Sequence, residues 1–317
     1  MLNLLRRGAA GPETVSPNAG WRPPEDAIWL DLLAPTREEE LAIEAALQLE
    51  LPTREEMAEI EPSSRLYQAS GATFMTATLL ARRDDNRRTD APVTFVLING
   101  LLITIRYDPL RAFDLFSERA KGLGVVSGTS ALFHLLDAAV ERLADLLELT
   151  GQDVEGVSHA IFQRPKGAQF ESLLTELARA QSLTSMTRNA LVSLARLFSF
   201  AALAHEIAED PDCRAHLRTL QRDGQSLTEH AGFQSSHIAF LLDAALGLIN
   251  IEQNGIIKFF SVAAVILMPP TLVASVYGMN FHHMPELAWP FGYPMALSLM
   301  AMSAIGPILW FKRRGWF

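Results

Sequence analysis

A Gly-Met-Asn tripeptide stands where a long uncharged segment of this chain ends. It is Gly278-Met279-Asn280, and the residues from Phe259 to Met279 carry no formal charge. Asn254 and Thr271 lie upstream, on one face if this segment is helical. Because amide and hydroxyl groups are costly against lipid, we expect these side chains to face a water-filled path. Their chemistry there would be hydrogen bonding to water or to the water shell of an ion.

The same face also carries apolar side chains. Ile257, Phe260 and Met268 recur with Asn254 and Thr271 at three- and four-residue spacing. Such residues on a pore wall would form a constriction that closes by dewetting. The alternative for each is an ordinary packing contact between helices. Pro269-Pro270, within the same segment, would bend or loosen a helix.

Two segments near the C-terminus are long and apolar enough to cross a membrane. Phe259–Met279 and Ala288–Phe311 both lack formal charge, and a spanning helix needs about 20 apolar residues. The sequence therefore predicts a two-pass membrane protein. We expect the first span over 258–280, an extracytoplasmic loop over 281–290, the second span over 291–311 and a basic tail over 312–317.

Charge predicts the orientation of these spans. Lys258 stands at the beginning of the first span and Lys312-Arg313-Arg314 follows the second, whereas the loop has Glu286 and no Lys or Arg. The positive-inside rule then places both termini in the cytoplasm.

The net charge of −9 argues against a nucleic-acid partner. The single cysteine, Cys213, forms no intrachain disulfide, fits a reducing compartment and is interpreted as an inert thiol.

The soluble part begins with residues 1–26, which are rich in Gly and Pro and predict a flexible lead-in. Residues 27–128 predict an α/β domain with a mixed or largely antiparallel sheet. Asn99-Gly100 lies between two β-branched runs and is a strong hairpin signal. The charged run 82–90 predicts a solvated turn. Thr36 with Glu39, and Thr53 with Glu56, are spaced as capping boxes that begin two helices.

Helical periodicity follows from residue 129 onward. Residues 129–208 predict an antiparallel pair of long helices, and 209–257 predict a stalk helix that continues into the first span. An unbroken helix from about Arg214 to Asn280 would be on the order of 100 Å long. Its glycines weaken it, so it would need partners in an oligomeric bundle. The alternative is a break near Gly224 or Gly232.

The C-terminal motifs, taken together, resemble the CorA family of magnesium channels, close to its enterobacterial-type branch. The resemblance is nearly continuous from Ile249 to Arg314, and the order of elements upstream agrees more loosely. It implies a funnel-shaped homopentamer in the inner membrane, with a cytoplasmic α/β domain, a pore-lining first span and a second span around it. The motifs are 249–254 (INIEQN), 269–271 (PPT), 277–280 (YGMN), 284–287 (MPEL), 291–294 (FGYP) and 312–314 (KRR).

By this resemblance the channel imports Mg²⁺ passively, and also Co²⁺ and Ni²⁺. Gly278, Met279 and Asn280 would form the selectivity filter, with Tyr277 as a brace. Glu286 would attract cations at the outer mouth, unless it is only an exposed structural acid. Closure at high cytosolic Mg²⁺ is a family property, and Asp243 is our candidate for the regulatory ion; the alternative is a solvated or paired stalk acid.

Two alternative functions are compatible with parts of the sequence. His282 and His283 depart from the acidic and aromatic residues expected there and could contact Zn²⁺, Co²⁺ or Ni²⁺, although two solvated loop histidines are the simpler interpretation. A zinc transporter of the ZntB type is one alternative, and Met279 argues against it. A membrane-anchored sensor is another. We expect no enzyme activity and no organic cofactor, since no nucleophile–base arrangement or phosphate-binding loop is evident.

Overall fold

The computed structural model of the chain divides into two compact units, Met1–Leu242 and Asp243–Phe317. Each unit is described by itself below. The structure describes residues 1–317 except 10, 19, 60, 84–87, 121, 123, 164–169, 281, 283 and 316–317, and except the side chains of Pro62, Glu286 and Leu287.

The first unit contains a seven-stranded mixed sheet. Strand order is β2-β1-β3-β7-β6-β5-β4, and every neighbouring pair is antiparallel except β3 with β7. This confirms the predicted α/β fold class with a mixed sheet. The strands are β1 (Leu2–Arg6), β2 (Glu13–Val15), β3 (Ala27–Leu33), β4 (Leu66–Ala69), β5 (Ala72–Arg82), β6 (Arg88–Ile98) and β7 (Leu101–Arg106).

Local signals in the sequence account for several boundaries. Asn99 and Gly100 have φ of 49° and 77°, so the β6–β7 connection is a two-residue turn of the kind that Asn-Gly favours. Both capping boxes are present: Thr36 begins α1 (Arg37–Leu47), and Thr53 begins α2 (Arg54–Ala58). A short α3 (Pro62–Arg65) leads into β4. These turn and cap predictions are confirmed.

Two predictions in this region are wrong. Residues 1–26 are not a flexible lead-in throughout, because β1 pairs with both β2 and β3, and Leu2, Leu4 and Leu5 are buried. Burial of these leucines outweighs the Gly and Pro content around them. The charged run 82–90 is not a turn throughout either. Strand β5 extends to Arg82 and β6 begins at Arg88, so only residues 83–87 remain between them, and 84–87 lie outside the described residues.

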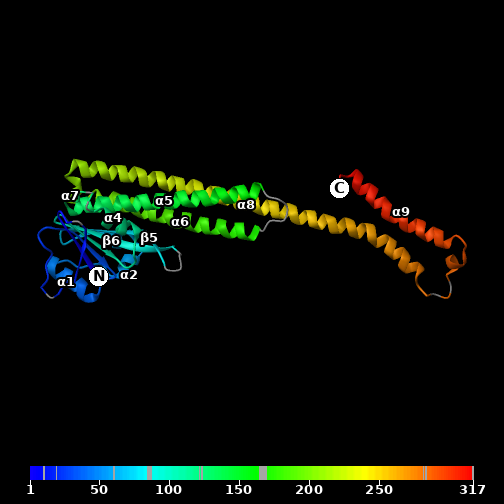
Figure 1. Cartoon of the computed structure of the whole chain (residues 1–317), viewed down its shortest axis with the longest axis horizontal. Helices are drawn as coiled ribbons and strands as arrows, with labels where there is room; N and C mark the ends of the chain where they lie inside the picture. Colours follow the sequence, from blue (N-terminus) through cyan, green and yellow to red (C-terminus); the bar gives the residue numbers. More distant parts are fainter. Residues whose placement is uncertain are drawn as a thin grey trace. The chain divides into compact units, whose positions relative to one another are not determined.

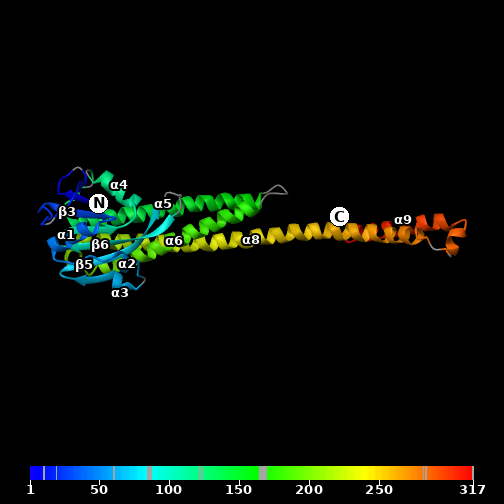
Figure 2. The ribbon, with the colours of Figure 1, turned by 90° about the horizontal axis from the view of Figure 1, so that it is seen from below.

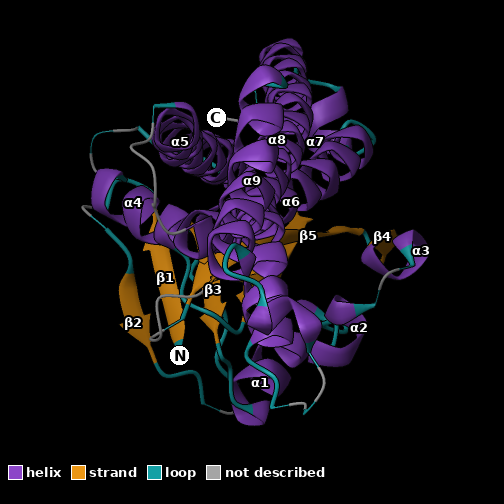
Figure 3. Ribbon diagram, turned by 90° about the vertical axis from the view of Figure 1, so that its right-hand side faces the viewer, coloured by secondary structure: helices purple, strands orange, loops and turns teal. Residues whose placement is uncertain are grey.

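Helices cover both faces of the sheet (Figure 3). One core joins α1 and α2 to alternate strand residues such as Leu30, Phe74 and Ile103. The other core joins the opposite strand residues, such as Trp29 and Phe95, to the longer helices. The two-residue period of each strand separates the two cores. The long helices are α5 (Gly128–Phe162), α6 (Phe170–Ala201) and α8 (Pro211–Tyr277). The same core includes residues of two shorter helices, α4 (Arg111–Arg119), which the sequence did not predict, and α7 (His205–Ala208).

Helices α5, α6 and the first part of α8 lie side by side (Figures 1 and 2). Polar contacts fix their register inside an otherwise apolar bundle. The Asp137 carboxylate on α5 is 2.9 and 3.0 Å from Nε2 of His216 on α8. The buried Gln234 side chain donates to the Leu147 carbonyl over 3.2 Å, and Gln181 on α6 donates to Ser235 over 2.8 Å. These contacts attach the beginning of α8 to the other two helices.

Helix α8 is unbroken over 67 residues. Its glycines, including Gly224 and Gly232, do not interrupt it, so the alternative of a broken stalk is wrong. The stalk therefore continues into the apolar segment, as predicted, although the helix ends at Tyr277 rather than at Asn280. In the second unit a 3₁₀ turn (Pro285–Ala288) then precedes α9 (Gly292–Arg313).

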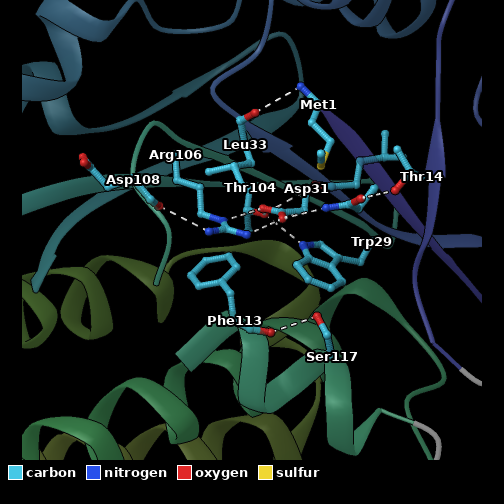
Figure 4. Close-up of polar contacts among 12 residues, drawn as sticks. Met1, Thr14, Trp29, Asp31, Leu33, Thr104, Arg106, Asp108, Phe113 and Ser117 are labelled. Carbon is cyan, nitrogen blue, oxygen red and sulfur yellow. Dashed lines mark hydrogen bonds and ion pairs between the residues drawn. The ribbon is translucent and has the colours of Figure 1, made fainter. Parts of the chain in front are cut away.

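A buried ion pair links β3 and β7 across the single parallel pairing of the sheet (Figure 4). Asp31 and Arg106 are only 1 % and 5 % exposed. Arg106 donates through Nε to Oδ1 of Asp31 over 3.0 Å and through Nη2 to Oδ2 over 2.8 Å. Thr104 also donates to Asp31, and the guanidinium lies 4.4 Å from the centre of the Phe113 ring. Each charge is thus compensated by a partner and by hydrogen bonds.

We expect Asp31→Asn to destabilise the first unit by about 3–5 kcal/mol, because the buried Arg106 charge loses its counter-charge. The melting temperature of the purified chain should fall by roughly 10 °C. The matched control is Asp114→Asn, since Asp114 is exposed and 4.0 Å from exposed Arg111. That substitution should change stability by less than about 1 kcal/mol. Equal melting temperatures for the two variants would contradict the proposed contribution of the buried ion pair to stability.

The start of α5 packs directly on the β6–β7 turn. The Gly128 nitrogen donates to the Gly100 carbonyl over 2.7 Å, and a Cβ at Gly128 would lie 2.6 Å from that oxygen and against the Leu102 nitrogen. Gly128→Ala should therefore cost at least about 2 kcal/mol, measured by thermal unfolding. Gly156→Ala, in the same helix with open space at its Cβ, should be neutral or stabilising by up to about 1 kcal/mol. A neutral Gly128→Ala would show that this contact can relax.

Candidate functional site

The candidate pore residues lie on one face of α8. A helix turns by about 100° per residue, so Asp243, Asn254 and Thr271 fall within an arc of about 120° on the unbroken helix. Ile257, Phe260 and Met268 fall within the same arc. All six side chains are exposed in the single chain. The structure thus gives these residues the common face that their spacing predicted.

Most of the apolar surface in the second unit is uncovered. Phe260 is 65 % exposed and Met268 69 % exposed. Only 6 % of the most apolar stretch of α8 and 11 % of that of α9 are buried, and both helices are long and apolar enough to cross a membrane. An apolar surface of this extent needs lipid, further copies of the chain, or both. The second unit is therefore incomplete as a single chain in water.

The Gly-Met-Asn tripeptide follows the last turn of α8. The Gly278 nitrogen donates to the Ala274 carbonyl over 2.9 Å, and the Met279 nitrogen donates to the Val276 carbonyl over 3.3 Å. Tyr277 is half-buried, and Asn280 is exposed just beyond the helix. The carbonyl end of a helix carries partial negative charge, which favours a cation there. An exposed amide at this end can accept hydrogen bonds from water bound to such a cation.

Gly278 does not adopt the left-handed backbone that glycine often allows at a helix end. It is not among the positive-φ glycines of the described residues. Instead, a Cβ at this position would lie 3.0 Å from the Ala274 carbonyl oxygen. Gly278 is therefore favoured by close approach to the preceding turn rather than by a left-handed backbone.

The proline pair changes the hydrogen bonding of α8 without interrupting it. Pro269 and Pro270 have no N–H, so the carbonyls of Val265 and Ile266 lose their usual donors within the helix. The Thr271 hydroxyl donates to the Leu267 carbonyl over 2.7 Å. Its proton is thereby used inside the helix, and its oxygen can still accept a hydrogen bond from water. The two freed carbonyls were not predicted, although the adjacent prolines signal them.

The remaining candidates lie at the beginning of this unit and in the segment between its two helices. Asp243 is exposed at its beginning, and His282 is exposed in the loop. His283 lies outside the described residues, as does the Glu286 side chain, whose backbone belongs to the 3₁₀ turn. Within the described part of the chain, no group of three or more His, Cys, Asp or Glu side chains could hold a metal ion. No protein-built zinc site is therefore found among these residues.

Cys213 lies outside this site, near the beginning of α8. Partial burial, together with a hydrogen bond to the Asp210 carboxylate, raises the pKa of its thiol to about 11. The thiol thus stays protonated at neutral pH and is a poor nucleophile, in keeping with the interpretation of an inert thiol.

Comparison with known proteins identifies the family. The family model described as CorA-like Mg²⁺ transporter protein matches residues 24–313, which include both apolar helices. The magnesium transport protein CorA of Salmonella typhimurium is 36 % identical over 293 residues, covering 92 % of each chain. The Escherichia coli K12 protein of the same name is 35 % identical over 297 residues, covering 93 % of each.

Solved structures of low sequence identity share the fold. The complete CorA magnesium transporter from Methanocaldococcus jannaschii aligns over 100 % of this chain and 99 % of its own, with a TM-score of 0.79 and 17 % identity. The ZntB cytoplasmic domain from Vibrio parahaemolyticus aligns over 79 % of this chain and 98 % of its own, with a TM-score of 0.58 and 11 % identity. These two solved structures share the fold of the first unit. The family match and the two apolar helices indicate that the chain is a membrane protein. The chain belongs to the family of CorA-like Mg²⁺ transporter proteins.

Proposed function

We propose that this protein is a passive channel that imports Mg²⁺ across the inner membrane, with both termini in the cytoplasm. The observation that carries the proposal is the unbroken α8, in which Asn254 and Thr271 share one face of an exposed apolar helix that ends three residues before Asn280. The relatives that match over nine-tenths of the chain are magnesium transport proteins. Lys258 and the basic residues at the end of α9 favour the cytoplasmic orientation.

The chemistry of Mg²⁺ explains why amides and hydroxyls suit this path. Mg²⁺ gives up its water shell reluctantly, so a fast pathway should bind the hydrated ion through its waters. Asn280 and Thr271 each offer an oxygen that accepts a hydrogen bond from such a water. A ring of Gly278-Met279-Asn280 segments would then form the filter, braced by Tyr277. Because this ring contacts water rather than metal, we extend the proposal to Co²⁺ and Ni²⁺.

The path requires several copies of the chain. One α8 cannot surround an ion, and its candidate pore face is exposed in the single chain. We propose a homopentamer in which α8 lines the pore and α9 lies outside it, as the family resemblance implies. Ile257, Phe260 and Met268 would then form the apolar constriction, and Glu286 would raise the cation concentration at the outer mouth.

No ATP-driven step is needed in this account. Moving two charges through the membrane potential releases about 4.6 kcal/mol per 100 mV. Intracellular Mg²⁺ would close the channel by binding near Asp243, whose carboxylate lies on the pore face of α8. Neither the zinc-transporter nor the sensor alternative is favoured by an observation on the described residues.

We expect Asn280→Ala to lower Mg²⁺ flux at least tenfold or to make it unselective, because the filter loses its water acceptor. Purified protein in liposomes, with a set membrane potential and a Mg²⁺ indicator inside, measures this directly. Ser298→Ala is the matched control, since Ser298 is a polar residue of α9 whose hydroxyl donates to the Pro294 carbonyl. Unchanged, selective flux through Asn280→Ala would contradict the filter assignment.

We expect Asp243→Asn to keep basal flux but to weaken closure by internal Mg²⁺, shifting the half-inhibiting concentration upward at least threefold. The same liposomes, loaded with graded Mg²⁺, give this curve. Glu252→Gln is the control, because Glu252 is an exposed acid about 180° around the same helix. If both variants retain the wild-type inhibition curve, Asp243 does not bind the regulatory ion.

A further inference from the structure

The end of α9 carries three exposed basic side chains, those of Lys312, Arg313 and Arg314. No acidic residue occurs anywhere in α9. Among the residues that the structure describes, none of the three basic side chains forms an ion pair. Their charges set the orientation of the spans, but three neighbouring cations also attract an anion.

The carbonyl end of α9 does not need these cations as caps. The Arg314 nitrogen donates to the carbonyls of Trp310 and Phe311 over 3.2 and 3.1 Å. The Gly315 nitrogen donates to the Lys312 carbonyl over 3.2 Å. Backbone N–H groups thus satisfy three of the four carbonyls that a helix end leaves without intrahelical donors. The charged ends of the basic side chains can therefore bind a ligand without uncapping the helix.

An aromatic ring holds one of these charges beside the apolar surface of α9. The guanidinium carbon of Arg314 lies 5.3 Å from the centre of the Trp310 ring, and Trp310 is 53 % exposed. The Trp310 ring in turn packs edge-to-face on the buried Phe311 ring, with 5.0 Å between the ring centres. The Arg314 guanidinium is attracted to the indole face, and its N–H groups can still donate to oxygen acceptors.

The place of this basic end in the membrane indicates which anion it meets. α9 is long and apolar enough to cross a bilayer, so its last turn lies at the depth of the lipid headgroups. Tryptophan and arginine side chains favour this depth. A neighbouring copy in the same orientation would bring its own three cations to the same depth and would not supply an anion. Anionic lipids do, because guanidinium groups bind phosphate oxygens with matched geometry.

We propose that the end of α9 is a binding site for an anionic phospholipid. The lipid phosphate accepts hydrogen bonds from Arg314 and from the neighbouring Lys312 and Arg313, while the acyl chains lie along apolar α9 beside Trp310. The site requires only that α9 spans a membrane. It therefore does not depend on which ion the protein carries.

Native mass spectrometry of the purified full-length protein in detergent tests the proposal. Phosphatidylglycerol and phosphatidylcholine with the same acyl chains are added separately, and phosphatidylglycerol should bind at least fivefold more tightly. Arg314→Gln should weaken phosphatidylglycerol binding about fivefold, the loss expected for one cation at a membrane surface. Lys312 and Arg313 keep the orientation signal in this variant. Arg314→Lys should restore most of the binding, and Trp310→Leu should weaken it at least twofold, because the guanidinium loses its ring.

Two matched variants serve as controls. Trp289→Leu removes an indole that is 51 % exposed but precedes α9, and Arg222→Gln removes an exposed cation of the first unit. Both should bind phosphatidylglycerol as the wild type does.

Equal binding of the two lipids by the wild type would overturn the proposal, as would equal phosphatidylglycerol affinity in Arg314→Gln and wild type. Displacement of phosphatidylglycerol by an equal concentration of inorganic phosphate would show that the site binds free phosphate rather than a lipid. The same spectra give the number of chains in the assembly. If Arg314→Gln lowers that number while the wild type does not prefer phosphatidylglycerol, the basic end contacts another copy and the lipid assignment is wrong.

Discussion

The continuity of α8 is the constraint on which the rest of the structure depends. A single helix begins against α5 and α6, where Gln234 and His216 fix its register, and ends in a stretch of which only 6 % is buried. Helical geometry therefore sets the angular position of each residue around the axis of this helix. Because no turn intervenes, Asp243 and Thr271 share a face of this helix.

The second consequence is that the chain is not self-sufficient. Polar groups at Asn254 and Thr271 require water, whereas the surrounding apolar side chains require lipid or protein. A bundle of α8 helices around a central path meets both requirements at once, because it turns one face of each helix inward. The first unit, by contrast, has two buried cores and a compensated Asp31–Arg106 pair within the single chain.

Local signals in the sequence predicted local structure well. The Asn99-Gly100 turn, the two capping boxes and the apolar spans follow from residues close together in the chain. Features that depend on distant partners were not predicted. β1 is a strand because β3 pairs with it, and the Asp31–Arg106 contact joins residues 75 positions apart. The candidate site residues were predicted from their spacing and from the family resemblance. The close approach of Gly278 to the Ala274 carbonyl was not predicted, because it depends on how the last turn of α8 ends.

The most direct test of the account is the water accessibility of α8 in a lipid bilayer. In a Cys213→Ala background, Thr271→Cys and Val273→Cys place thiols about 160° apart around the helix. A membrane-impermeant cationic thiol reagent should modify Thr271→Cys and reduce Mg²⁺ flux, while leaving Val273→Cys unmodified. Equal labelling of the two positions, or labelling of Val273→Cys alone, would contradict the claim that this face of α8 lines the ion path.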